Sequence, residues 1–66
     1  MLDTTKRYKH YRNKKLYVIE QFCNIQMNDI WISAVLYYCI DESEKKYVRS
    51  MREFKAKFEV INDETH

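Results

Sequence analysis

The sequence predicts a small, mainly β domain, and three observations support this prediction. The chain has 66 residues, which is the length of one domain. Residues 30–40, IWISAVLYYCI, carry no charge and are mostly β-branched or aromatic, which favours a largely buried strand over a helix. The remaining apolar runs are short enough to form further strands packed on this one.

Two strands are expected before this central stretch. Residues 8–12 are predicted to form the first strand and residues 16–25 the second, with a turn at residues 12–15. The second strand has apolar side chains on both faces, which indicates a strongly bent strand. One face would carry Tyr17, Ile19, Cys23 and Ile25, and the other would carry Leu16, Val18 and Phe22.

The absence of glycine restricts the turns. A tight hairpin turn then requires Asn or Asp at its positions of positive φ. Asn28 and Asp29 are the expected turn of a long hairpin formed by the second and central strands, and the other candidates are Asn13, Asn24, Asp41, Asn62 and Asp63. This hairpin would place Cys23 opposite residues 33–34 and Cys39 opposite residues 17–18, so the two cysteines are expected to be buried free thiols.

The segment after residue 42 has two interpretations. Apolar side chains at Tyr47, Met51, Phe54 and Phe58 have the spacing of a helix over residues 43–58, with Asp41 or Ser43 as its N-cap. The alternative is a strand at residues 45–50, one helical turn at residues 51–55 and a last strand at residues 57–61. Residues 1–5 and 62–66 are expected to fray.

Several short motifs favour the second interpretation. The chain has YKHYRN at residues 8–13, LYVI at 16–19, AVLY at 34–37, YVRSMREF at 47–54 and FEVI at 58–61. Their order resembles a family of short bacterial and phage proteins of unknown function, although Tyr47 and Ser50 stand where that family has Trp and Pro. The family is similar to small SH3-like barrels of about five strands. The resemblance therefore implies a strand at residues 47–50 and a helical turn at residues 51–55, and it implies no activity.

The sequence favours a binding protein over an enzyme. No cysteine or histidine pair has the spacing of a metal site, and no acid–base or nucleophile constellation is present, so neither a metal nor a cofactor is expected. The first residues lack the apolar core of a signal peptide, and no apolar run approaches a membrane span. We therefore expect a cytoplasmic protein, located in the host cytoplasm if a phage encodes it.

Five residues are the first candidates for a ligand or partner site: His10, Tyr11, Tyr37, Tyr47 and Arg49. They match the family's motifs, and the resemblance implies an aromatic surface that contacts a protein segment or a small polar ligand. Arg49 would bind a carboxylate or phosphate. In the alternative interpretation the tyrosines border the core, and Arg49 pairs with Glu20, Glu53 or Glu59.

A basic N-terminal stretch suggests nucleic-acid binding as a second function. The residues concerned are Lys6, Arg7, Lys9, Arg12, Lys14 and Lys15. They would contact phosphates while neighbouring rings stack on bases, or they would simply form a solvated edge strand. Such a basic edge would also permit a homodimer through the acidic central hairpin.

Two further expectations concern partners. Trp31 begins the central strand and is expected to be either a partly buried packing residue or an exposed contact for a partner. The small size and the phage members of the resembling family suggest a third function, inhibition of a host protein.

Overall fold

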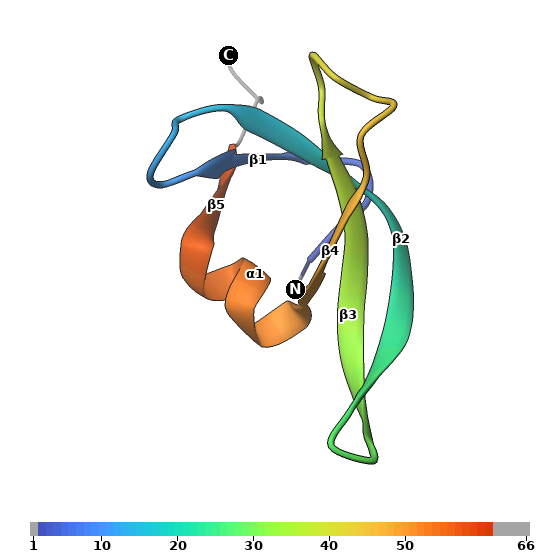
Figure 1. The fold of residues 1–66 in the computed structure, drawn as a ribbon. Helices are drawn as coiled ribbons and strands as arrows, with labels where there is room; N and C mark the ends of the chain where they lie inside the picture. The colour runs from blue at the N-terminus through green and yellow to red at the C-terminus, as the bar shows by residue number, and fades with distance from the viewer. Residues whose placement is uncertain (1, 62–66) are drawn as a thin grey trace.

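One antiparallel sheet of five strands, with one short helix, is formed by residues 2–61, the residues that the computed structural model describes (Figure 1). The strands are β1 (Arg7–His10), β2 (Leu16–Met27), β3 (Ile30–Cys39), β4 (Tyr47–Ser50) and β5 (Phe58–Ile61), and α1 (Met51–Lys57) joins β4 to β5. The strand order is β4-β3-β2-β1-β5. The predicted mainly β, barrel-like fold is confirmed, and the helix over residues 43–58 is wrong.

The helix begins at Met51 because Ser50 caps it. The Ser50 hydroxyl accepts a hydrogen bond from the Glu53 backbone N–H at 3.1 Å, while Ser50 itself has extended backbone angles. The expected caps Asp41 and Ser43 are therefore also wrong. The helix continues for seven residues, which is longer than the predicted single turn, and the last strand begins one residue later than predicted.

The long hairpin turns at Asn28 and Asp29 as predicted. Both residues have positive φ, 51° and 66°, which matches the type I′ turn that suits twisted strands. The register pairs Cys23 with Ala34 and Tyr17 with Cys39, also as predicted. Both cysteines are free thiols, although only Cys39 is buried and Cys23 is partly exposed.

A bulge in β2 corrects the predicted faces of that strand. The register shifts between Ile19 and Gln21, so Ile19 pairs with Tyr37 and Phe22 pairs with Val35. Tyr37 and Val35 lie two residues apart on one face of β3, which places Phe22, and not Cys23, on the same face as Ile19. The strand is bent as expected, but the change of face takes place at the bulge.

The first turn differs from its prediction because side chains organise it. β1 ends at His10 rather than residue 12, and Lys14, not Asn13, takes the positive φ of 64°. The Asn13 side chain instead accepts a hydrogen bond from the Lys15 N–H at 2.8 Å, as in an Asx turn. Asn13 also donates to the Tyr17 hydroxyl at 3.1 Å.

β1 lies inside the sheet, between β2 and β5. The interpretation of the basic stretch as a solvated edge strand is therefore wrong, and a dimer through a basic edge lacks the edge that it requires. The edges of the described sheet are β4 and β5, and α1 connects them. Residues 1–5 were expected to fray, but residues 2–5 are held in place, because Leu2 packs against the core and the Asp3 N–H donates to the Tyr8 hydroxyl at 2.7 Å. Residues 1 and 62–66, which were also expected to fray, lie outside the described residues.

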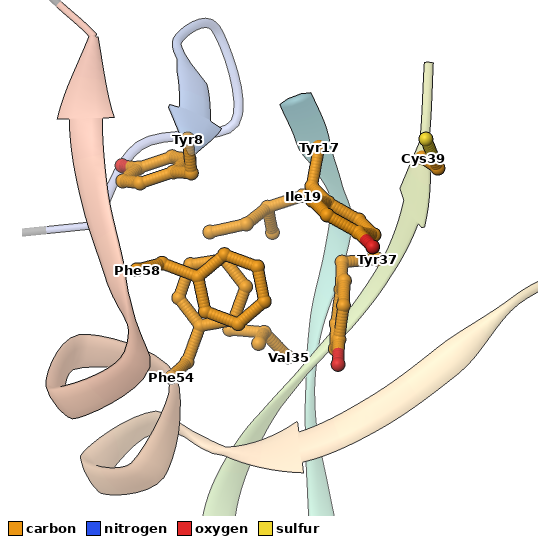
Figure 2. Close-up of a cluster of buried hydrophobic side chains, with 8 residues drawn as sticks. All are labelled: Tyr8, Tyr17, Ile19, Val35, Tyr37, Cys39, Phe54 and Phe58. Carbon is orange, nitrogen blue, oxygen red and sulfur yellow. The ribbon is translucent and has the colours of Figure 1, made fainter. Parts of the chain in front are cut away.

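An aromatic cluster fills the space between the sheet and α1 (Figure 2). Phe54 is fully buried, stacks on Phe58 at 4.1 Å between ring centroids, and meets Tyr8 and Tyr37 edge-on. Edge-on and stacked ring pairs stabilise a core beyond the area they bury. The cluster consists of Tyr8, Tyr17, Ile19, Val35, Tyr37, Cys39, Phe54 and Phe58.

The far end of the β2–β3 hairpin projects beyond this core (Figure 1). Trp31 is 67% exposed and Ile30 is 62% exposed. The central stretch is therefore buried mainly from Ala34 onward, and Trp31 is not a packing residue. Its exposure agrees with the alternative of a partner contact.

Candidate functional site

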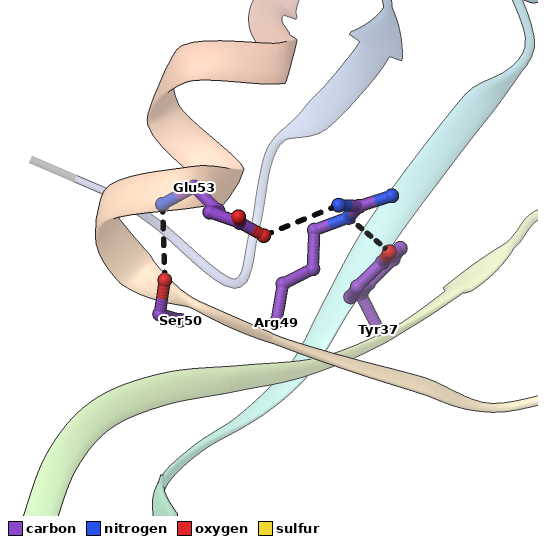
Figure 3. A network of polar contacts seen from close by, with 4 residues as sticks. All are labelled: Tyr37, Arg49, Ser50 and Glu53. Atoms are coloured by element: carbon purple, nitrogen blue, oxygen red, sulfur yellow. Dashed lines mark hydrogen bonds and ion pairs between the residues drawn. The ribbon is translucent and has the colours of Figure 1, made fainter. Parts of the chain in front are cut away.

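Arg49 is the centre of a polar network at the edge of the aromatic core (Figure 3). Its position opposite Val35 places it on the core-facing side of the sheet. Its Nε donates to the Tyr37 hydroxyl at 2.9 Å, and its Nη1 lies 3.4 Å from Glu53 Oε1. The pairing of Arg49 with Glu53 that the sequence offered as an alternative is thus present, whereas Glu20 pairs with Lys46 at 2.7 Å.

Tyr37 is a core residue with its hydroxyl at the rim. Its side chain is only 4% exposed. Burial raises the pKa of this hydroxyl, partly opposed by the hydrogen bond from Arg49. Tyr37 therefore stays neutral near pH 7, and its hydroxyl accepts the hydrogen bond that orients the Arg49 guanidinium.

His10 is held in one orientation by the turn after β1. Its Nδ1 accepts hydrogen bonds from the Arg12 N–H at 3.0 Å and the Asn13 N–H at 3.4 Å. Its ring meets Phe58 edge-on at 4.7 Å. Because Nδ1 accepts, the neutral ring carries its proton on Nε2. Desolvation lowers the pKa of His10, and the charges of Arg49, Arg12 and Lys57 lower it further.

Three surface depressions meet at Arg49. The largest, about 500 Å³, extends over Tyr47, Val48 and Glu53 toward the hairpin. A second, about 290 Å³, is lined by His10, Tyr11, Arg12, Arg49, Ala56 and Lys57. The smallest, about 190 Å³, is lined by His10, Asn13, Tyr17, Tyr37, Tyr47, Arg49 and Phe58. Arg49 is the residue that lines all three.

The structure thus brings all five first candidates onto one face. Tyr11 and Tyr47 are about half exposed, at 50% and 41%, and offer ring surface to a ligand, whereas Tyr37 is buried. Lys57 also lines this face, but it was not a candidate. No sequence pattern indicates Lys57, because the last residue of α1 reaches His10 only through the pairing of β1 with β5.

The six basic candidates do not form one surface. Arg7 and Lys9 alternate with the buried Tyr8 in β1 and therefore project from the other face of the sheet. Lys6, Lys14 and Lys15 are exposed in the segments that flank β1. Of the six, Arg12 lines the depression of about 290 Å³ together with Arg49.

We expect the free energy of unfolding to decrease at acid pH because His10 becomes protonated. Protonation of Nδ1 would remove the acceptor for two backbone N–H groups, which is consistent with a folded-state pKa below 6.5. Because the pKa of His10 is lower in the folded state than in the unfolded state, His10 contributes stability above about pH 6.5. This contribution is lost as the pH falls through the folded-state pKa. Urea unfolding between about pH 5 and 8 measures this loss.

His10→Asn is the matched control, because the Asn oxygen takes the place of Nδ1 without titrating in this range. The wild type should lose stability relative to this variant as the pH decreases. Parallel curves for the two proteins would show that His10 does not carry the effect.

Within residues 2–61, no three His, Cys, Asp or Glu side chains come together as a metal site would require. The one helix in this range is too short to cross a membrane. Comparisons with protein-family models, with curated proteins and with solved structures find no match for this chain.

Proposed function

We propose that this protein is a non-catalytic binding module and that it binds its ligand on the face centred on Arg49. One observation carries the proposal: Arg49 lines three adjoining depressions, and its Nη2 has no hydrogen-bond partner among residues 2–61. A guanidinium held by its Nε, with a free terminal nitrogen, is ready to donate to an incoming acceptor.

The ligand that fits this face has an anionic group. A flat or apolar part of the same ligand lies beside that group. Carboxylate and phosphate are the groups that match a guanidinium. The partly exposed rings of Tyr11 and Tyr47 each line a depression together with Arg49, where they offer apolar or stacking contact. The strand order, with a helix before the last strand, supports the SH3-like barrel that the family resemblance implies.

The histidine at the site supports binding rather than catalysis. A general base needs an available lone pair, and Nδ1 of His10 already accepts two backbone N–H groups. What remains is Nε2, which donates in the neutral ring.

An NMR titration of the labelled protein tests the proposal. The probes are inorganic phosphate, an aromatic dipeptide with a free carboxylate, and a short oligonucleotide. At least one should shift the signals of Tyr11, Tyr47 and the Arg49 side chain. Arg49→Gln should abolish these shifts, whereas Arg52→Gln, at an exposed helix position, should retain them. If no probe shifts this face, the proposal fails.

A further inference from the structure

Three cations from three separate elements converge on one depression. Arg12 follows β1, Arg49 lies in β4 and Lys57 ends α1, and they line the depression of about 290 Å³ together with His10, Tyr11 and Ala56. The Glu53 carboxylate lies 3.4 Å from Arg49 on the Nη1 side. Like charges that converge in this way repel one another unless an anion lies between them.

The depression is preorganised. The Tyr11 N–H donates to the Lys57 carbonyl at 3.0 Å, which ties the turn after β1 to the end of α1. His10 Nδ1 fixes the same turn through Arg12 and Asn13. Arg49 is fixed through its Nε. Within residues 2–61, the donors at this depression that remain are Arg49 Nη2, the Nε2–H of His10 and the charged ends of Arg12 and Lys57.

We propose that this depression binds a phosphate group of single-stranded nucleic acid, with the adjoining base stacked on Tyr11. This inference rests on the proposed function and names its ligand class. Three cations and an imidazole N–H exceed what one carboxylate needs, since a single guanidinium matches a carboxylate. They suit a phosphate, which accepts several charge-assisted hydrogen bonds.

The surroundings favour nucleic acid over a phosphorylated side chain. Lys14 and Lys15 are exposed in the same turn as Arg12, which adds two positive charges close in sequence to the depression. Tyr11 is 50% exposed and lines the depression, where its ring offers a stacking surface for a base. A single phosphorylated residue would leave these two lysines without a phosphate to contact.

Fluorescence anisotropy with a labelled oligothymidylate at several salt concentrations measures the binding. With the phosphate in the depression and about two neighbouring phosphates of the strand neutralised, log K should fall with log salt with a slope of roughly −2. Arg12→Gln and Lys57→Gln should each weaken binding at low salt and make the slope shallower. Lys9→Gln removes the same charge from the other face of the sheet, and it should leave the slope unchanged.

Tyr11 tests the stacking contact. Tyr11→Ala should weaken binding about tenfold, and Tyr11→Phe should restore it because the ring is retained. Equal losses of oligonucleotide affinity in the Lys9→Gln and Lys57→Gln variants would contradict the proposed site. Tighter binding of a phosphotyrosine peptide than of the oligonucleotide would also contradict it. If the oligonucleotide fails while the dipeptide still shifts Arg49 in the NMR titration, this inference fails and the proposed function stands. If neither binds, both fail.

Discussion

Phe54→Ala is expected to leave much of the protein unfolded at room temperature. Phe54 is fully buried and contacts the rings of Phe58, Tyr8 and Tyr37. Removing a buried Phe side chain costs about 3–5 kcal/mol. A domain of this length has a total stability of roughly 3–10 kcal/mol, so the loss removes a large part of it. The helix is affected first, because Phe54 is its buried residue.

Phe22→Ala provides the matched control. Phe22 is the same residue type, but it is 44% exposed and lies outside the ring cluster. Its loss should cost less than half as much, measured as the free energy of unfolding from urea titrations followed by circular dichroism. Equal costs at the two positions would show that Phe54 does not centre the core.

The parts of the fold that the sequence predicted are those with local causes. Positive φ at Asn28 and Asp29 suits residues that tolerate the left-handed region, and this turn then determines the register of the long hairpin. The sequence pattern allowed both the short helix and the longer one, and only the family resemblance favoured the short helix. Residue spacing alone fitted a longer helix equally well, since Tyr47, Phe54 and Phe58 all face one core from three different elements.

The parts that were not predicted depend on pairing between distant segments. β1 lies inside the sheet because β5 returns to pair with it, and no local pattern in residues 7–10 indicates this. The bulge after Ile19 is likewise visible only through its partner strand. Trp31 is exposed because the hairpin extends beyond the elements that cover its base.

Only part of the candidate site could be predicted from the sequence, because the rest also depends on pairing between distant segments. Motif matching selected His10 and Arg49, and the structure places them on one face. Motif matching could not separate Arg12 from Arg7 and Lys9, because the distinction depends on where β1 ends and on which face of the sheet each side chain lies. Nor could it find Lys57, which joins the site only through the fold.

Arg49→Met is expected to cost about 1–3 kcal/mol of stability even though Arg49 lies at the surface of the core. The substitution keeps most of the aliphatic stem but leaves the Tyr37 hydroxyl, on a side chain that is 4% exposed, without its donor. Losing a hydrogen bond from a charged donor carries a cost of this size. Tyr37→Phe removes the hydroxyl and should restore part of the loss in the double variant.

The double-mutant cycle separates the structural role of Arg49 from its proposed binding role. We expect a coupling of about 1 kcal/mol between Arg49 and Tyr37 in urea unfolding. Additive costs would show that their hydrogen bond does not contribute. Binding should respond differently, because the bond uses Nε and leaves Nη2 for the ligand. Tyr37→Phe keeps the charge and should weaken oligonucleotide binding only modestly, whereas Arg49→Met removes the charge and should weaken it in the single and double variants alike.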